Sequence, residues 1–128
     1  MQPTDPCPCG SEDAFGACCQ AFHHGELPAT AEQLMRSRYS AYAVGNMDYI
    51  WATWDPGTRP AGTMPDAVLP WVRLEIVDTE AGGPDDDRGV VEYRAFYRDG
   101  EGSSVLHERS TFTRRAGRWF YVDGDLYE

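Results

Sequence analysis

Large side chains recur at helical spacing between residues 30 and 45. They would share one face of a helix and are Leu34, Met35, Arg38, Tyr39 and Tyr42. Thr30 is a suitable N-cap residue, and Gln33 stands three positions later, as a capping box requires. Gly45 suits the left-handed position that follows a helix. The pattern therefore predicts a helix that begins after Thr30 and ends at Gly45.

A second, shorter helix is predicted from Met47 or Asp48 to about Trp54, with Asn46 as its cap. Its large side chains are Tyr49, Ile50, Trp51 and Trp54. We expect the sequence 55–57, Asp-Pro-Gly, to end it, because proline and glycine interrupt helices. Residues 58–65 are expected to form a loop, and residues 65–69 a single helical turn that stops before Pro70.

The second half of the chain changes to the two-residue period of β-strands. Residues 71–77 alternate, which places Val72, Leu74 and Ile76 on one face. Further strands are predicted at 90–98, 105–114 and 119–122, joined by turns at 99–102 and 115–118. Asp123 and Gly124 are expected to end the last strand, and the acidic segment 82–87 to be a solvated turn.

Helices followed by four consecutive strands predict an α+β fold, with the helices packed on one face of a curved antiparallel sheet. The 128 residues suit one domain and a small appendage, with a division at residue 24 or 25. A formal charge of −10 disfavours nucleic acid as a partner. The chain contains no apolar run long enough to cross a membrane. We therefore expect a globular protein with neither nucleic acid nor membrane as its partner.

All four cysteines lie near the start of the chain, at Cys7, Cys9, Cys18 and Cys19. Two close pairs of thiolates around a short loop are typical of a structural zinc site. The alternatives to a metal site are disulfides that join one cysteine pair to the other, or free thiols. The first residues have neither the basic nor the apolar segment of a secretory signal, so we expect a reducing cytoplasm, where metal binding is favoured. His23 and His24 follow closely but are expected to be exposed, in a linker that spans residues 20–30.

The first cysteines stand in the sequence Cys-Pro-Cys-Gly-Ser at 7–11, with Phe15 and the pair Cys18-Cys19 after it. This arrangement resembles the SEC-C motif, a short zinc-binding knuckle. Some copies of the motif use histidine as the fourth ligand, and many carry lysines in the intervening loop. Here the fourth position is Cys19, and residues 12–17 include no basic residue. The resemblance implies one structural zinc in a knuckle over residues 1–24.

Four later segments extend the resemblance over most of the chain. They are residues 34–42 (LMRSRYSAY), 53–56 (TWDP), 107–112 (HERSTF) and 117–124 (GRWFYVDG). Together with the knuckle they resemble the YchJ family, small bacterial proteins of unestablished role. That resemblance implies that residues 25–128 form a cone-shaped domain similar to nuclear transport factor 2. This fold hosts both enzymes and non-catalytic binding proteins.

A cone-shaped domain has a pocket between its first helix and the concave face of the sheet. Candidate lining residues are Arg38, Tyr39, Tyr42, Trp54, Tyr93, Tyr97, His107 and Arg109. Alternation along 105–114 places His107 and Arg109 on one face and Glu108 on the other, and either face can point inward. An inward Glu108 would need a partner, and Arg38 is the candidate. His107, or Glu108 paired with an arginine such as Arg38 or Arg109, is a candidate general acid or base.

Three functions fit these features. The favoured one is a zinc-binding adaptor that contacts a protein partner through its knuckle and holds a peptide or small ligand in its cone. This choice rests on the four cysteines, which leave the metal no open position for chemistry. The second is a small-molecule enzyme that uses the pocket. The third is a redox sensor whose thiolates release zinc on oxidation.

Overall fold

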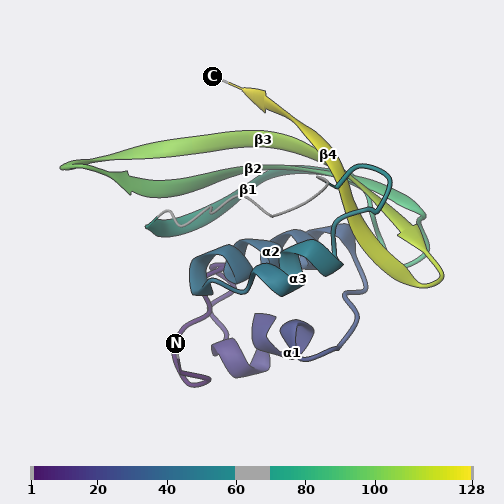
Figure 1. Ribbon diagram of the computed structural model, residues 1–128, viewed down its shortest axis with the longest axis horizontal. Helices are drawn as coiled ribbons and strands as arrows, with labels where there is room; N and C mark the ends of the chain where they lie inside the picture. Colours follow the sequence, from purple (N-terminus) through teal and green to yellow (C-terminus); the bar gives the residue numbers. More distant parts are fainter. Residues whose placement is uncertain (1, 60–69, 128) are drawn as a thin grey trace.

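The computed structural model describes residues 2–59 and 70–127 as three layers (Figure 1). A curved four-stranded antiparallel sheet forms one layer. Helices α2 (Ala31–Val44) and α3 (Met47–Ala52) lie beneath it. The N-terminal segment, with the 3-10 helix η1 (Phe15–Ala17) and helix α1 (Cys19–His23), lies on the other side of α2. The predicted α+β fold with a preceding cysteine knuckle is confirmed. The helical turn predicted at 65–69 lies outside the described residues.

The sheet is a simple meander in the order β1-β2-β3-β4. Its strands are β1 (Trp71–Ala81), β2 (Arg88–Asp99), β3 (Gly102–Arg115) and β4 (Arg118–Tyr127). A register shift between Trp71 and Arg73 leaves Val72 52% exposed, so the prediction that Val72 shares a face with Leu74 and Ile76 was wrong. The expected end at Asp123 and Gly124 was also wrong, because β4 continues to Tyr127. The four strands and their order were predicted correctly, but all four are longer than expected.

Both helices begin at the predicted caps. The Thr30 hydroxyl accepts a hydrogen bond from the backbone N–H of Gln33, and Gly45 ends α2 in the left-handed region with φ of 78°. The Gln33 side chain accepts from the N–H of Ala29 at 2.7 Å, so it reaches outside the helix. In α3 the Asn46 side chain accepts from the N–H of Tyr49 at 3.2 Å. This helix ends at Ala52, before the predicted Trp54.

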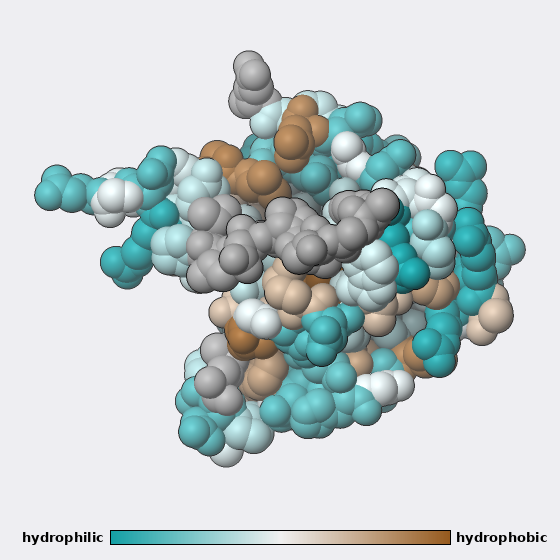
Figure 2. Space-filling view, in the orientation of Figure 1, coloured by the Kyte–Doolittle hydropathy of each residue, from teal (hydrophilic) through white to brown (hydrophobic). Residues whose placement is uncertain are grey.

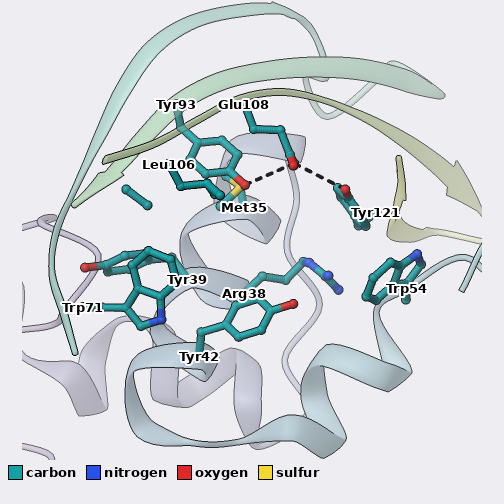
Figure 3. A pocket seen from close by; sticks show the side chains of 11 residues that line it. Met35, Arg38, Tyr39, Tyr42, Trp54, Trp71, Tyr93, Leu106, Glu108 and Tyr121 are labelled. Carbon is teal, nitrogen blue, oxygen red and sulfur yellow. Dashed lines mark hydrogen bonds between the residues drawn. The ribbon is translucent and has the colours of Figure 1, made fainter. Parts of the chain in front are cut away.

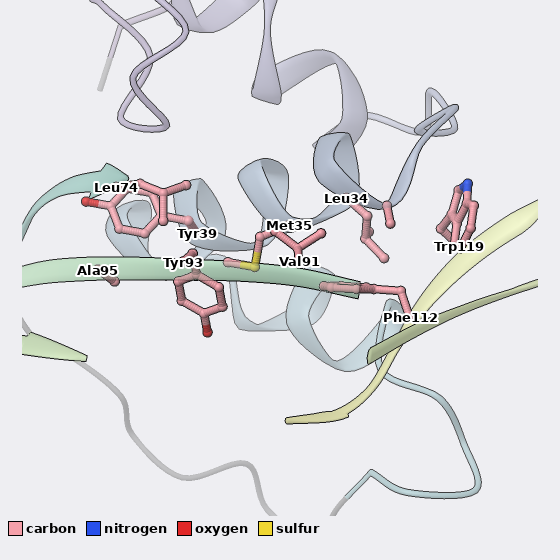
Figure 4. Close-up of a cluster of buried hydrophobic side chains, with 10 residues drawn as sticks. Leu34, Met35, Tyr39, Leu74, Val91, Tyr93, Ala95, Phe112 and Trp119 are labelled. Carbon is pink, nitrogen blue, oxygen red and sulfur yellow. The ribbon is translucent and has the colours of Figure 1, made fainter. Parts of the chain in front are cut away.

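The core lies between α2 and the sheet (Figure 4). Its buried side chains are Ala31, Leu34, Met35, Tyr39, Leu74, Val91, Tyr93, Ala95, Phe112 and Trp119. Leu34 and Phe112 are fully buried, and each such side chain contributes roughly 1.5–3 kcal/mol by leaving water. The indole N–H of Trp119 donates to the carbonyl of Ala29 at 3.2 Å. The core therefore joins the start of α2 to all four strands.

Replacing Gly89 by alanine is expected to lower the free energy of unfolding by about 2 kcal/mol, as overpacking in a core does. A Cβ atom at Gly89 would lie 2.5 Å from the Cα atom of Gly82 and 3.0 Å from the Cβ atom of Ala31. Gly82 is itself held there, because its carbonyl accepts from the N–H of Ala31 at 2.9 Å. Urea unfolding measures the effect. Gly102→Ala is the control, since its nearest contact would be an ordinary 3.8 Å, and equal stability of the two variants would contradict the prediction.

Hydrophilic residues predominate on the face of the molecule shown in Figure 2, with small separate groups of hydrophobic residues between them. Among the helices that the structure describes, none is both long enough and apolar enough to cross a membrane. The longest, α2, has 14 residues, and its two sides are covered by the sheet and the knuckle. This helix therefore stands between the two candidate sites.

Candidate functional site

The four cysteines form one compact cluster. Their Sγ atoms all lie within 4.8 Å of one another, and Cys7, Cys9 and Cys19 are buried. The Sγ atom of Cys18 lies 3.6 Å from that of Cys9 and 3.9 Å from that of Cys19. Zinc–sulfur bonds of about 2.3 Å in a tetrahedron separate sulfur atoms by about 3.8 Å. All four thiols are free of disulfides, so the cluster has the spacing of a site that can hold a metal ion.

Local hydrogen bonds explain why this segment folds around the cluster. Gly10 adopts φ of 82° and donates its N–H to the carbonyl of Cys7 at 3.2 Å, which closes a tight turn. The N–H of Cys7 in turn donates to the carbonyl of Asp13 at 2.9 Å. The Ser11 hydroxyl lies 3.1 Å from the Sγ atom of Cys18. A hydroxyl in this place supports a thiolate ligand from outside the coordination shell.

The thiols are close enough to share protons. Hydrogen bonds from Cys19 and Cys9 lower the pKa of Cys7 far below its usual range, and the contact with Cys7 raises the pKa of Cys19. Burial raises the pKa of Cys18 to about 11. The thiols therefore shift one another's pKa values through their mutual contacts. A bound cation would replace the protons, because metal ligands must be deprotonated.

The cysteine cluster is docked on α2. The Arg36 guanidinium donates from Nη1 to the carbonyl of Cys9 at 2.6 Å, and the Sγ atom of Cys7 lies 3.5 Å from the Ser40 hydroxyl. His23 contributes a third contact, since its Nε2 lies 2.9 Å from the carbonyl of Ser37 and must donate to it. These contacts place the knuckle against one side of the helix, while the opposite side faces the sheet.

His23 corrects two predictions. It belongs to helix α1, so the first part of the predicted linker is helical, and it is half-buried between Phe15 and Tyr49, with ring centroids 5.8 Å and 4.6 Å away. Burial lowers the pKa of His23 below its ordinary value. His24 is exposed as predicted. In the described chain the metal-site cluster consists of the cysteines alone, so His23 acts as a packing residue between knuckle and helices.

A second candidate site is a cavity of about 300 Å³ between α2 and the sheet (Figure 3). Its lining consists of Met35, Arg38, Tyr39, Tyr42, Trp54, Trp71, Tyr93, Ala95, Leu106, Glu108 and Tyr121. Of the predicted lining, Tyr97 is absent and instead packs beside Trp71 with ring centroids 5.4 Å apart. Tyr121 was missed, although its two-residue spacing from the buried Trp119 indicates an inward position.

Backbone hydrogen bonds between residues 53–55 and β4 position Trp54 in the lining of this cavity. The N–H of Asp55 donates to the carbonyl of Tyr121 at 2.7 Å, and the N–H of Tyr121 donates to the carbonyl of Thr53 at 2.8 Å. These two bonds hold the segment after α3 beside β4. The rings of Trp54 and Tyr121 then meet edge to face with centroids 5.2 Å apart. The arrangement joins residues 67 positions apart, which no local pattern specifies.

Arg38 is the buried cation of the cavity, with 4% of its surface exposed. Its Nη1 donates to the carbonyl of Ile50 at 3.0 Å and to the Thr53 hydroxyl at 2.7 Å. Its guanidinium carbon lies 4.6 Å from the ring centroid of Tyr121 and 5.4 Å from that of Trp54. Burial lowers the pKa of Arg38, although the guanidinium stays charged because its ordinary pKa is far above neutral.

Glu108 points into the same cavity, so the even-numbered face of β3 is the inner one. Its Oε2 atom accepts hydrogen bonds from the hydroxyls of Tyr93 at 3.1 Å, Tyr121 at 3.3 Å and, at shorter range, Ser110. Among the described residues, no ion pair joins Glu108 to Arg38, so that predicted pair is not formed. The three hydroxyl groups bind the Glu108 carboxylate instead. Burial, followed by the Glu108 charge, raises the pKa values of Tyr93 and Tyr121.

Gly124 makes room for the Glu108 side chain. The two residues lie on adjacent strands, and a Cβ atom at Gly124 would come within 2.6 Å of the Glu108 carboxyl carbon. From the sequence, this glycine was predicted to end a strand. Its place within β4, opposite Ser110, gives it a packing role that only the register of the two strands reveals.

His107 and Arg109 lie on the opposite, outer face of β3. His107 Nε2 contacts Glu92 at 2.8 Å, and Arg109 contacts Glu92 at 3.0 Å, Asp78 at 3.3 Å and Glu80 at 3.0 Å. The hydrogen bond with His107, followed by that with Arg109, lowers the pKa of Glu92. The four candidate catalytic residues are therefore divided, with Arg38 and Glu108 in the cavity and the other two in a network outside it.

Comparison with known proteins gives one consistent result. A family model described as the YchJ middle NTF2-like domain matches residues 30–124, and the SEC-C motif model matches residues 4–21. A UPF0225 protein of Corynebacterium efficiens is 50% identical over 123 residues, which cover 95% of this chain and 94% of the relative. A UPF0225 protein of Streptomyces coelicolor is 46% identical over 127 residues, with coverage of 98% and 99%.

Two solved structures share the whole architecture. The solution structure of a SEC-C motif containing protein from Rhodopseudomonas palustris matches with a TM-score of 0.82 and 33% identity, and covers 97% of this chain and 100% of its own. The crystal structure of a SEC-C motif containing protein from Psychrobacter arcticus has a TM-score of 0.81 and 26% identity, with coverage of 98% and 85%. The likeness therefore includes the knuckle as well as the domain that follows.

Proposed function

This chain belongs to the YchJ family, and from that premise we propose that it is a zinc-dependent binding protein with a ligand cavity in its cone-shaped domain. The observation that carries the proposal is the approach of four cysteine sulfur atoms to within 4.8 Å of one another. Four thiolates match the charge and tetrahedral geometry that zinc prefers. They also fill its coordination shell, so the ion has a structural role and no open position for a substrate.

In this proposal the metal holds the knuckle on α2. Cys9 and Cys7 contact α2 through Arg36 and Ser40, and one turn of the same helix contributes Arg38 and Tyr39 to the cavity. The helix is a rigid element shared by both sites. Zinc would thus stabilise the wall of the cavity from behind, while the ligand binds on the other side.

The outer loop of the knuckle is the proposed contact for a protein partner. Residues 12–14 are exposed and include the carboxylates of Glu12 and Asp13. A partner that binds there would present basic side chains, because charge complementarity guides association. The exposure and the negative charge of residues 12–14 support this contact. The opposite face of the knuckle packs against α2 and cannot bind a partner.

Binding is favoured over the two alternative functions for separate reasons. The enzyme alternative relied on four polar candidates at one site, but His107 and Arg109 lie outside the cavity that contains Arg38 and Glu108. A redox sensor would need thiols open to oxidants, but Cys7, Cys9 and Cys19 are 5% exposed or less. The geometry therefore supports a structural metal and a binding cavity.

Metal content measured by plasma mass spectrometry tests the zinc assignment. We expect about one zinc per chain in untagged protein, together with thiols that react with a colorimetric reagent only after chelation. The control is the same titration on protein unfolded in denaturant, where all four thiols should react. Protein that contains no metal and whose four thiols react without chelation would refute the proposal.

A further inference from the structure

One oxygen atom of the Glu108 carboxylate accepts all the hydrogen bonds that this side chain makes in the described chain. The Oε2 atom accepts from the hydroxyls of Tyr93, Tyr121 and Ser110, whereas no described donor contacts the other oxygen, Oε1. Both oxygen atoms of an ionised carboxylate can accept hydrogen bonds, and the Glu108 side chain lines the cavity. Oε1 is therefore an acceptor that a ligand in the cavity can use.

The three hydroxyl groups also fix the orientation of the carboxylate. Burial raises the pKa values of Tyr93 and Tyr121, so both hydroxyls keep their protons and donate. A Cβ atom at Gly124 would lie 2.6 Å from Oε2, which places this oxygen beside β4. With Oε2 held there by three donors, a ligand would contact Glu108 through Oε1.

The charged side chains in the cavity lining balance each other. Among the lining residues that the structure describes, Arg38 is the one cation and Glu108 the one carboxylate. Burial raises the pKa of Tyr42, Arg38 lowers it and Glu108 raises it, so both charges act at the same place. An anionic ligand would meet the like charge of Glu108, and a cationic ligand that of Arg38. Because either ion would also lose its hydration, an uncharged ligand is favoured.

The rest of the lining favours a flat and largely apolar ligand. The cavity volume is about 300 Å³, at the lower end of the range of about 300 to 1,000 Å³ for ligand sites. Most of the lining is aromatic and consists of Tyr39, Tyr42, Trp54, Trp71, Tyr93 and Tyr121. Aromatic side chains pack well against another ring. A small ring compound therefore fits both the volume and the walls.

We propose that the cavity binds a small uncharged aromatic compound whose hydroxyl or N–H group donates a hydrogen bond to Oε1 of Glu108. The ring packs among the aromatic side chains, and the donor repeats on Oε1 the contact that tyrosine hydroxyls make with Oε2. A hydrogen bond to a charged acceptor is stronger than one between neutral groups, and this bond forms without a further ion in the cavity. The inference rests on the proposed function, because it assigns a ligand class to the cavity described there.

Four probes with the same ring test the inference. They are phenol, anisole, benzoate and benzylamine, titrated at neutral pH into the metal-loaded protein while methionine methyl signals are followed by NMR. Anisole lacks the donor of phenol, and the other two carry opposite charges. Phenol should shift the signal of Met35, which lines the cavity, and bind at least tenfold more tightly than each of the others, as expected for one hydrogen bond to a charged group. The signal of Met47, at the start of α3, is the internal control and should not move.

A matched pair of substitutions locates the contact. In Glu108→Gln the three hydroxyls need the amide oxygen, so an NH₂ donor takes the place of Oε1 and the Kd for phenol should rise about tenfold. The Kd for anisole should stay the same, which shows that the cavity is intact. Glu75→Gln is the same change outside the cavity, where Glu75 pairs with Arg94 at 2.8 Å, and neither Kd should change. If Glu108→Gln did not fold, the comparison of phenol with anisole in the parent protein would still decide the inference.

The outcomes separate the inference from the proposed function. Equal or tighter binding of benzoate or benzylamine at the Met35 signal would overturn the uncharged class and leave a ligand-binding cavity in place. Equal binding of phenol and anisole, or an unchanged phenol Kd in Glu108→Gln, would overturn the contact with Oε1. If none of the four probes moved the Met35 signal, the inference would fall together with the ligand-binding part of the proposed function, while the zinc assignment would stand on its own measurement.

Discussion

Replacing Cys9 by serine is expected to remove bound metal and to lower the free energy of unfolding of the whole chain by roughly 4 kcal/mol or more, as loss of a structural metal does. Cys9 is fully buried, and its carbonyl is the acceptor for the Arg36 guanidinium on α2. A hydroxyl is a much poorer zinc ligand than a thiolate, so three cysteines would have to hold the ion. The knuckle and its packing against α2 should both become less stable.

Thermal unfolding followed together with zinc content per chain measures this effect. Ser11→Ala is the matched control, because it removes a hydroxyl 3.1 Å from Cys18 while all four thiols remain. It should keep its zinc stoichiometry and most of its stability. A Cys9→Ser protein that melts at the same temperature as the parent, or one that still binds one zinc per chain, would show that the cluster is not the structural metal site described above.

Replacing Arg38 by glutamine is expected to lower the free energy of unfolding by about 2–3 kcal/mol, because hydrogen bonds from a buried charged group are lost. Arg38 connects α2 to the end of α3 through Ile50 and Thr53. It also fills the space between the rings of Trp54 and Tyr121. The shorter neutral side chain leaves one of these carbonyl or hydroxyl acceptors without its donor.

Urea unfolding of Arg38→Gln and Arg73→Gln compares the same substitution in two environments. The Arg73 side chain is 60% exposed and lies over the ring of Phe96 at 4.0 Å, so its loss should change stability by about 0.5 kcal/mol or less. If the two variants lost equal stability, the buried contacts of Arg38 would contribute nothing beyond a surface arginine. The result is independent of whether any ligand binds.

The local elements were predictable because their causes lie within a few residues. The caps at Thr30 and Asn46 bind N–H groups three positions ahead, so the same short stretch contains donor and acceptor. The cysteine pairs are equally local, since only eight residues lie between Cys9 and Cys18. Where a local pattern was misread, as at Val72, a β-bulge had changed the register between strands.

The cavity was predictable only in part. Tyr39, Tyr42 and Arg38 share a helix face that the 3.6-residue period identifies. On β3, however, both faces carry a mixture of polar and apolar side chains, and alternation alone gave no preference. The inner face became known only from the pairing of β3 with β2 and β4, which surrounds Glu108 with Tyr93 and Tyr121.

By itself, then, the sequence determined the cysteine cluster, the helix caps, the order of the strands and the α+β class, because these depend on neighbours along the chain. The tertiary structure decided that Glu108 points inward to the hydroxyls of Ser110, Tyr93 and Tyr121, that His23 is packed between knuckle and helices, and that Gly124 leaves space for a carboxylate. Each of these depends on the register of strands or on the docking of the knuckle against α2. Such contacts join residues far apart in sequence, and the spacing of side chains within one element does not encode them.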